Sequence, residues 1–154
     1  MAVIRDPAKL EGRRSTIYPA EFAKGFDGRC KRALGNAGGL TQFGVNLTML
    51  DPGAVSALRH WHAREDEFIY VLDGEVVLVT DEGEETLGPG MAAAFPAGEA
   101  IGHMLANRSS APATYLEVGS RSAEEEIAYP DLDLKLTRRD GKNVFTRKSG
   151  EPVE

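Results

Sequence analysis

The sequence contains few of the residues that carry chemistry. Among its 154 residues are one cysteine, one tryptophan and three histidines. A single cysteine, Cys30, excludes an intrachain disulfide and is typical of proteins from a reducing compartment. No stretch reaches the roughly 20 consecutive apolar residues of a membrane helix, and the N-terminal residues lack the apolar run of a signal peptide. We therefore expect a cytoplasmic protein that does not enter a membrane.

Basic residues are also outnumbered. Lysine and arginine total 18 against 24 aspartates and glutamates, which gives a formal net charge of -6. Nucleic-acid binding needs clustered cations, whereas the basic residues of 138–148 have aspartates among and before them. No segment has the length and periodicity of a helix-turn-helix. The composition therefore argues against nucleic acid as a partner, and its 42% hydrophobic and 27% charged residues are typical of a folded domain.

Glycine and proline divide the middle of the chain into segments of strand length. The alternation of apolar and polar residues predicts strands at 39–50, 57–63, 67–72, 75–80, 91–95, 103–107 and 114–118. Residues 57–63 and 67–72 are expected to pair as a hairpin. Short helical segments are expected at 19–24 and at 122–127, where Ser122 precedes Glu125 with capping-box spacing. The pattern predicts an all-β sandwich or barrel with short flanking helical turns and extended termini.

The length allows one domain. We expect an N-terminal flanking segment at 1–38, a barrel core at 39–119 and a C-terminal extension at 120–154. Within the extension, 129–134 should be extended and Asp140-Gly141 should form a hairpin turn. The extension is expected to pack on the barrel or on a partner subunit.

The three histidines provide a candidate metal site. His60 and His62 alternate along one expected strand and therefore share a face. Glu67 follows an acidic turn, and His103 begins another strand that barrel closure would bring opposite. Three imidazoles and a carboxylate suit zinc, iron, manganese, nickel or cobalt and leave positions open for a ligand. On spacing alone, the histidine pair is also compatible with surface residues, and Glu65 and Asp66 compete with Glu67 as the fourth ligand.

The order of these residues resembles the two motifs of the cupin superfamily. The first motif, a glycine, a His-x-His pair, a glutamate and a glycine, is matched by Gly53, His60, His62, Glu67 and Gly74. The second is matched by Gly90, Pro96, Gly98, His103 and Asn107, with four residues between Gly98 and His103 where the strict pattern has two. The resemblance implies a jelly-roll β-barrel and the metal ligands His60, His62, Glu67 and His103. It selects Glu67 over its acidic neighbours.

The flanking sequence looks like that of small bacterial single-domain cupins that are labelled sugar-phosphate-isomerase-like or regulator-like. This resemblance implies a metal-dependent enzyme acting on a small oxygenated molecule, such as a sugar or sugar phosphate. Tyr115 and Glu117 are candidates for proton transfer, whereas Tyr70 is expected to face outward. Arg64 and Arg108 are candidates for contacting a phosphate at the rim. An Fe(II)-dependent dioxygenase and a non-catalytic sensor of a small ligand are the alternatives.

An apolar outward face is also expected on the strands that carry the histidines. Trp61, Phe68, Tyr70 and Leu72 would lie on it, opposite to the ligands. An exposed apolar patch of this kind is usually covered by another surface. We therefore expect a homodimer that exchanges N- or C-terminal segments.

Overall fold

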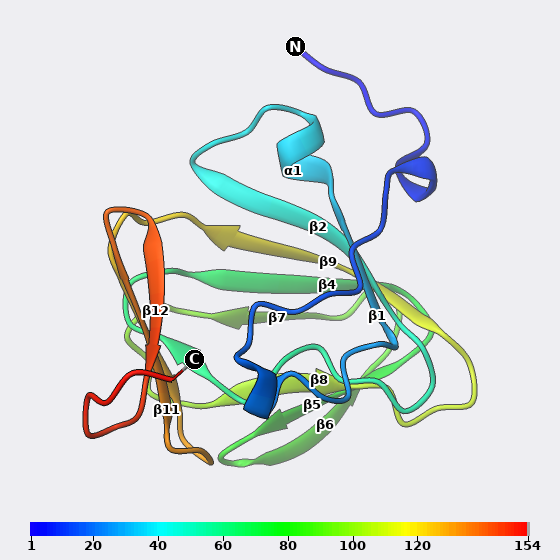
Figure 1. The fold of residues 1–154 in the computed structure, drawn as a ribbon. Coiled ribbons are helices and arrows are strands. Elements are labelled where there is room, and N and C mark those ends of the chain that lie inside the picture. The colour runs from blue at the N-terminus through cyan, green and yellow to red at the C-terminus, as the bar shows by residue number, and fades with distance from the viewer. Residues whose placement is uncertain (154) are drawn as a thin grey trace.

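The computed structural model describes residues 1–153, and within that range the fold is almost entirely β-structure (Figure 1). The strands are β1 (Arg29–Ala33), β2 (Phe43–Leu50), β3 (Trp61–His62), β4 (Glu67–Asp73), β5 (Val76–Thr80), β6 (Gly83–Leu87), β7 (Ala92–Phe95), β8 (His103–Ala106), β9 (Ala113–Ser120), β10 (Glu125–Tyr129), β11 (Leu134–Arg139) and β12 (Lys142–Thr146). Short helical segments are η1 (Pro7–Lys9), η2 (Ala20–Phe22) and α1 (Leu34–Ala37). None of the helices in residues 1–153 has the length and apolar character needed to cross a membrane.

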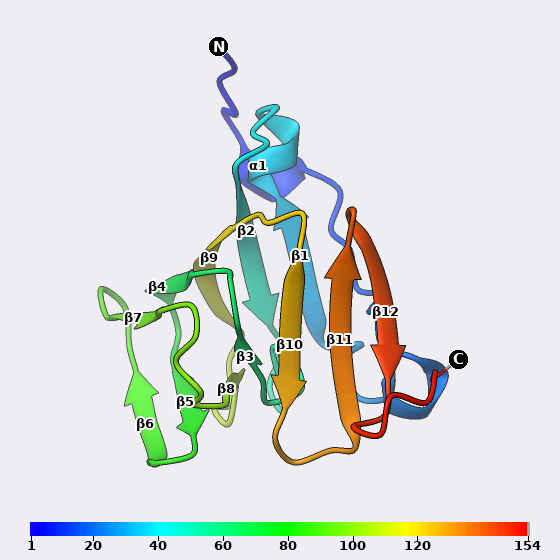
Figure 2. The same cartoon turned by 90° about the vertical axis from the view of Figure 1, so that its left-hand side faces the viewer.

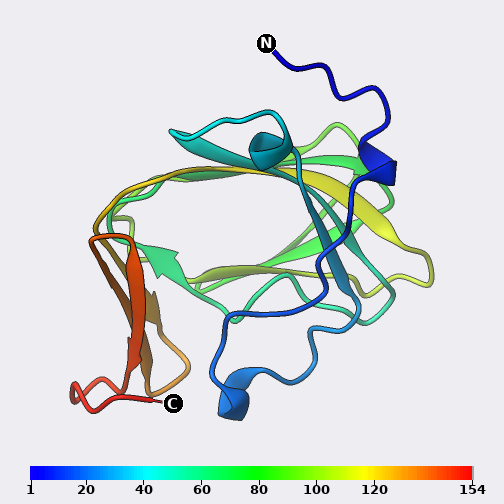
Figure 3. The ribbon, with the colours of Figure 1, turned by 45° about the horizontal axis from the view of Figure 1, so that its top comes forward.

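The largest sheet has five antiparallel strands in the order β1-β2-β9-β4-β7. Alternate residues of its strands face inward, so Ile69 and Val71 of β4 and Tyr115 of β9 are buried. A three-stranded sheet, β6-β5-β8, faces it from the other side of the barrel (Figures 1 and 3). Val76 and Leu105 of this second sheet complete the same core. The two facing sheets confirm the expected jelly-roll barrel.

A four-stranded sheet, β12-β11-β10-β3, stands beside the barrel (Figure 2). Its apolar residues form a second core of Ile127, Tyr129, Leu134 and Leu136. Tyr18 and Phe22 of the N-terminal segment pack against that core. The C-terminal residues thus pack on the chain's own N-terminal segment, and they connect to the barrel through β3.

The helix expected at 122–127 is wrong. Residues from Glu125 onward form β10, in which Glu125, Ile127 and Tyr129 are buried and the residues between them are not. This alternation has the period of a strand. The capping box does not form, because the Ser122 N–H donates to Glu65 and not to Glu125. The neighbouring expectation at 129–134 is also wrong, since these residues turn between β10 and β11, whereas Asp140-Gly141 does connect β11 to β12.

The strand expected at 57–63 is reduced to Trp61–His62, and it does not pair with β4. Its partner is β10, where His62 lies opposite Ile127. Upstream, the chain touches β8 only through isolated bridges, including His60 with His103. The hairpin was expected because the two segments are close in sequence, but the pairing is with a strand more than 60 residues away.

The turn at Gly74 shows why glycine is needed between β4 and β5. Its φ is +71°, a conformation that residues with a side chain rarely adopt. A Cβ at this position would lie 2.6 Å from the backbone oxygen of Pro112. The glycine therefore lets the chain pass close to β9 while it reverses direction.

Candidate metal centre

Two of the histidines are joined through their backbones. The His60 N–H donates to the His103 carbonyl oxygen at 3.1 Å, and the His103 N–H donates to the His60 carbonyl oxygen at 2.9 Å. This antiparallel pair places both imidazoles side by side, with ring centres 4.9 Å apart. A contact between residues far apart in sequence is thus fixed by main-chain hydrogen bonds.

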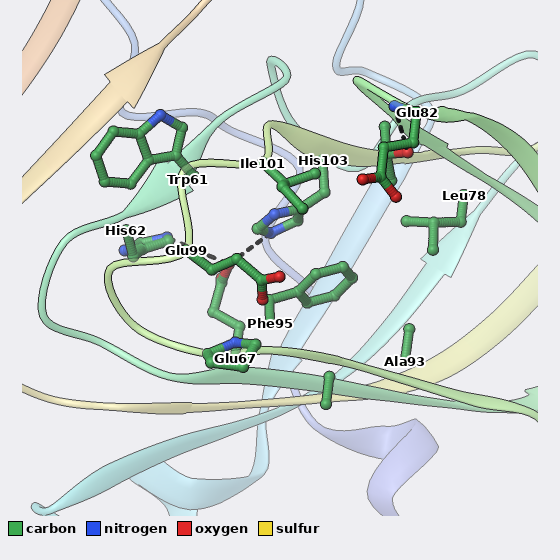
Figure 4. A pocket seen from close by; sticks show the side chains of 13 residues that line it. Trp61, His62, Glu67, Leu78, Glu82, Ala93, Phe95, Glu99, Ile101 and His103 are labelled. Carbon is green, nitrogen blue, oxygen red and sulfur yellow. Dashed lines mark hydrogen bonds and ion pairs between the residues drawn. The ribbon is translucent and has the colours of Figure 1, made fainter.

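Glu67 lies at the centre of the cluster. Its Oε2 atom is 2.8 Å from Nε2 of His103, 3.3 Å from Nε2 of His62 and 3.6 Å from Nε2 of His60. Figure 4 shows the carboxylate between His62 and His103. The structure therefore brings together all four residues expected as ligands, and each histidine presents the same ring nitrogen.

Neighbouring groups fix the ring orientations of His60 and His103. Nδ1 of His60 lies 2.7 Å from the carbonyl oxygen of Leu58, which can only accept, so this nitrogen donates the hydrogen bond and Nε2 faces the cluster. The His103 ring stacks on Phe95 with a centroid distance of 3.7 Å and an angle of 8° between the planes. Both contacts hold an imidazole with Nε2 directed at Glu67.

Residues of the cluster shift one another's pKa values. Burial raises the pKa of Glu67, but hydrogen bonds with His103, His60 and His62 outweigh burial and hold the pKa well below its usual range. Burial lowers the pKa of His62, but the nearby carboxylates, Glu67 foremost, outweigh burial and raise it. The carboxylate is therefore ionised at neutral pH, which is the form that binds a cation.

The donor atoms fit a divalent transition metal. Bonds of about 2.1 Å to an ion place neighbouring donor atoms about 3.0 to 3.4 Å apart in octahedral or tetrahedral geometry. The observed separations between Glu67 Oε2 and the three Nε2 atoms, 2.8 to 3.6 Å, span this range. Imidazole nitrogen and carboxylate oxygen are also ligands that such metals prefer. His60, His62 and Glu67 present donor atoms within 4.8 Å of one another and could hold one ion, with His103 Nε2 beside Glu67.

Two cavities reach the cluster, and the charged residues that line them differ. The smaller, of about 180 Å³, is lined by Trp61, Glu82 and Glu99 and by no lysine or arginine (Figure 4). The larger, of about 800 Å³, also reaches His60, His62, Glu67 and His103. Its basic lining residues are Arg13, Arg29, Lys31, Arg121 and Arg138. An anionic molecule is therefore better matched to the larger cavity.

An ion pair faces the cluster across the larger cavity. Lys31 Nζ lies 2.6 Å from Oε1 of Glu117, and the Asn46 side chain donates to the same oxygen at 3.0 Å. The side chains of Lys31 and Glu117 are each 20% exposed. Glu117 stands opposite Ile69 on the neighbouring strand, two residues along from Glu67. Inward-facing residues in such a diagonal relation have Cβ atoms roughly 7 to 8 Å apart.

Tyr115, the other candidate for proton transfer, is completely buried. It lies on β9 two residues before Glu117. Its hydroxyl oxygen has no hydrogen-bond partner among the described residues. Burial raises its pKa well above the usual range, with the Glu117 carboxylate adding to the shift. Tyr115 therefore remains a neutral phenol behind the Glu117 side chain.

Tyr70, Arg64 and Arg108 were also assigned positions from the sequence. Tyr70 is exposed on the outside of the barrel, as expected. Arg64 and Arg108 line neither of these cavities, and instead approach Glu124 and Glu84 on the surface. The phosphate contacts expected from them therefore stay a prediction.

Trp61 was expected on the same outer face as Phe68, and this is also wrong. It lies beside His62 and lines the smaller cavity (Figure 4). The reason is that β3 and β4 belong to different sheets, so their outer faces do not form one surface. The exposed apolar face comprises Phe68, Tyr70 and Leu72 of β4, each 40–43% exposed.

Comparison with known proteins agrees with this arrangement. The Cupin domain family matches residues 46–119, a range that contains all four residues of the cluster. A solved structure from Silicibacter pomeroyi DSS-3, described as a sugar phosphate isomerase from the cupin superfamily, is 47% identical, and the match covers 97% of this chain and 95% of that one with a TM-score of 0.92. The chain belongs to the cupin superfamily.

Two further structures resemble this cupin. A candidate sugar phosphate isomerase from Acidithiobacillus ferrooxidans is 24% identical, with coverage of 100% of this chain and 96% of that one and a TM-score of 0.84. The polyketide cyclase RemF from Streptomyces resistomycificus is 27% identical, with coverage of 78% and 80% and a TM-score of 0.63. The first of these supports the fold alone. No curated protein matches the cupin significantly.

Some residues around the cluster were not expected from the sequence. Lys31 lies on β1, outside both motifs, and the pairings of β1 with β2 and of β2 with β9 bring it beside Glu117. Glu125 was read as part of a helix, yet it reaches the back of His62. A period-two alternation from Glu125 to Tyr129 was the available signal for this strand.

Proposed function

We propose that this cupin is a metal-dependent isomerase of a sugar or sugar phosphate. The observation that carries the proposal is the convergence of His60, His62 and His103 on Glu67, beside a cavity that also contains the Lys31–Glu117 pair. Isomerisation of a hydroxy carbonyl compound needs a polarised carbonyl and a group that moves a proton between neighbouring carbons. The 47% identical cupin described as a sugar phosphate isomerase supports the same reaction class.

The ligands of the metal would be His60, His62, Glu67 and His103. A bound zinc, iron, manganese, nickel or cobalt ion would polarise the substrate carbonyl and stabilise charge that develops on its oxygen. Each histidine would contribute Nε2, and Glu67 its Oε2 atom. Their remaining contacts, such as His60 with Leu58 and His103 with Phe95, keep the donor atoms in place.

Glu117 is the residue we assign to proton transfer. It lies on the inner face of the barrel, two residues along the paired strands from Glu67, and is partly open to the cavity. Its carboxylate would accept the proton of the hydroxyl-bearing carbon next to the carbonyl and return it to the former carbonyl carbon, while the hydroxyl proton passes to the former carbonyl oxygen. Lys31 and Asn46 hold one oxygen, which orients the other oxygen for this exchange. Tyr115 stays protonated behind Glu117 and supports its position.

The charge of the larger cavity favours an anionic substrate. Arg29 is buried in its wall, where one guanidinium nitrogen donates to the carbonyl oxygen of Ser56 at 2.6 Å. Its Nε atom has no partner among residues 1–153. Arg13 lines the same cavity from the N-terminal segment, next to Lys31. A phosphate or carboxylate group would be attracted to these cations, whereas the acidic smaller cavity would repel it.

Exchange of substrate hydrogen with solvent tests the proposal. Metal-free protein is reconstituted with each of the five metals and mixed with aldose and ketose phosphates in deuterated water, and proton NMR follows the product and the carbon next to the carbonyl. We expect interconversion with deuterium incorporation for at least one metal. Metal binding without turnover of any sugar would contradict the isomerase and support a sensor, and oxygen consumption with substrate would support an Fe(II)-dependent dioxygenase.

We also propose that the cupin is a homodimer. The support is the exposed apolar face of Phe68, Tyr70 and Leu72, which lies on the outer side of β4. A second copy is the partner that would cover such a face symmetrically.

A further inference from the structure

His62 is held from the side opposite to the metal cluster. Its Nε2 atom lies 3.3 Å from Glu67, whereas Nδ1 lies 3.4 Å from Oε2 of Glu125 and 3.7 Å from Oε2 of Glu65. The strand that carries His62 has only two residues and pairs with β10, the strand that begins at Glu125. The ring therefore lies between Glu67 on its Nε2 side and Glu65 and Glu125 on its Nδ1 side.

Glu125 is fully buried, and both of its oxygens have assigned contacts. Its Oε1 atom accepts hydrogen bonds from the backbone N–H groups of Arg64 at 2.9 Å and Glu126 at 2.7 Å. Its Oε2 atom is left for His62. A buried carboxylate held in this way can accept a proton donor at Oε2 but cannot turn away from it.

Glu65 is fixed by the C-terminal strands. Its Oε1 atom accepts from the Ser122 N–H at 2.8 Å and from the Arg138 guanidinium of β11 at 2.5 Å. Its Oε2 atom is directed at His62, slightly beyond hydrogen-bond distance. Arg138 thus offsets the charge of one of the two carboxylates behind the ring.

His62, Glu65 and Glu125 also have the composition of a second metal site. The contacts argue against that reading. One oxygen of each carboxylate is already occupied by N–H donors, and Arg138 places a positive charge beside Glu65. When Nε2 binds a metal, the ring proton lies on Nδ1, and the carboxylate acceptors at Nδ1 stabilise that arrangement against the one with the proton on Nε2, where Glu67 would accept it.

We propose that Glu125, assisted by Glu65, is a positioning residue that fixes the His62 proton on Nδ1 and directs the lone pair of Nε2 at the metal. This inference rests on the proposed metal site and extends it to the C-terminal strands. Residues 120–153 then do more than cover the barrel, because β10 and β11 set the orientation of one ligand.

The Glu125→Gln variant isolates this role. A glutamine has one acceptor oxygen, so keeping the N–H bonds of Arg64 and Glu126 turns its amide NH₂ toward His62 Nδ1. The amide N–H would then face the N–H at Nδ1 of His62. The His62 proton would therefore move to Nε2. We expect the dissociation constant for zinc, measured against a competing chelator, to rise by about 10- to 100-fold. Glu126→Gln, on the same strand but exposed to solvent, is the matched control and should bind zinc like the wild type.

Nitrogen NMR of the zinc-loaded proteins supplies a second measurement. In the wild type the zinc-bound His62 ring should carry its proton on Nδ1, whereas Glu125→Gln at the same zinc concentration should show a fraction of the ring with its proton on Nε2 and no zinc bound, with circular dichroism unchanged in both. Wild-type zinc affinity in a folded Glu125→Gln variant, or two zinc ions per wild-type chain, would overturn the positioning role alone. A wild type that binds no zinc or other transition metal would instead refute the metal site on which the inference depends.

Discussion

Phe95 and His103 lie face to face, with ring centroids 3.7 Å apart. Phe95 is the last residue of β7 and stands opposite Glu67 on β4, so one side chain contacts both the strand of the carboxylate and the ring of a histidine. Removing the phenyl ring in Phe95→Ala should leave His103 free to rotate. We expect metal affinity to fall roughly 10-fold, as when other supporting contacts of metal ligands are lost.

Phe95→Leu is the control for volume, because leucine restores apolar bulk without a flat face. It should recover the thermal stability lost in Phe95→Ala but only part of the metal affinity. Metal binding by Phe95→Ala equal to that of the wild type would show that stacking has no part in orienting His103.

Glu117→Gln should separate turnover from metal binding. The amide keeps the size of the side chain but cannot accept a proton from carbon, so isomerase turnover should fall by about 100- to 10,000-fold. Metal content should stay at the wild-type level, because Glu117 contacts Lys31 and Asn46 and no residue of the cluster. Steady-state kinetics and metal analysis on the same preparation provide the check. Equal turnover by the variant would remove Glu117 from the reaction.

Asp131 makes the stability depend on pH. Hydrogen bonds from Arg59, at 2.7 Å and 2.5 Å, lower the pKa of Asp131, and Lys148 adds a smaller effect of the same sign. Because the folded-state pKa lies below that of the unfolded chain, the pair stabilises the fold fully above about pH 3.9 and ceases to do so as pH falls through the folded-state pKa. Asp131→Asn should therefore be less stable than the wild type at neutral pH and equally stable in strong acid.

The size of this effect is limited by solvent, since the Asp131 side chain is 56% exposed. We expect a difference of at most about 1 kcal/mol in the free energy of unfolding. Urea unfolding at both pH values measures it, with Glu85→Gln, an exposed carboxylate of β6, as the control. A difference that persists undiminished in strong acid would mean that the substitution acts through something other than the charge of Asp131.

The apolar face predicts the oligomeric state. Light scattering coupled to size exclusion should give the mass of a dimer for the wild type. Phe68→Glu with Leu72→Glu should give a monomer, because both substitutions place charge on that face. Val144→Glu, at an exposed position of β12, is the control and should remain dimeric. A wild type of monomer mass would contradict the proposal.

The cluster was predicted from the order and spacing of a few residues together with their resemblance to the two cupin motifs. His60, His62, Glu67 and His103 lie on inward-facing positions, and the alternation of Glu67, Ile69 and Val71 on β4 gave the correct face. Period-two alternation and glycine turns such as Gly74 also predicted the barrel. These features are local in sequence, so they can be recognised without knowing which strands pair.

The surroundings of the cluster depend on pairings that local patterns do not encode. Ser122 and Glu125 have the spacing of a helix start, yet burial of Ile127 and Tyr129 against the N-terminal segment makes the residues from Glu125 a strand. Lys31 reaches Glu117 through two strand pairings, β1 with β2 and β2 with β9. Each of these contacts joins residues more than 55 positions apart, where sequence spacing carries no information.

The metal content of the purified cupin tests the central claim most directly. After reconstitution and removal of free ions, elemental analysis of the wild type should find one transition-metal ion per chain. The His60→Ala, His62→Ala double variant should keep its β-sheet circular dichroism and contain no bound metal. A wild type that binds no metal, or a folded double variant that retains it, would contradict the assignment of these residues to a metal centre.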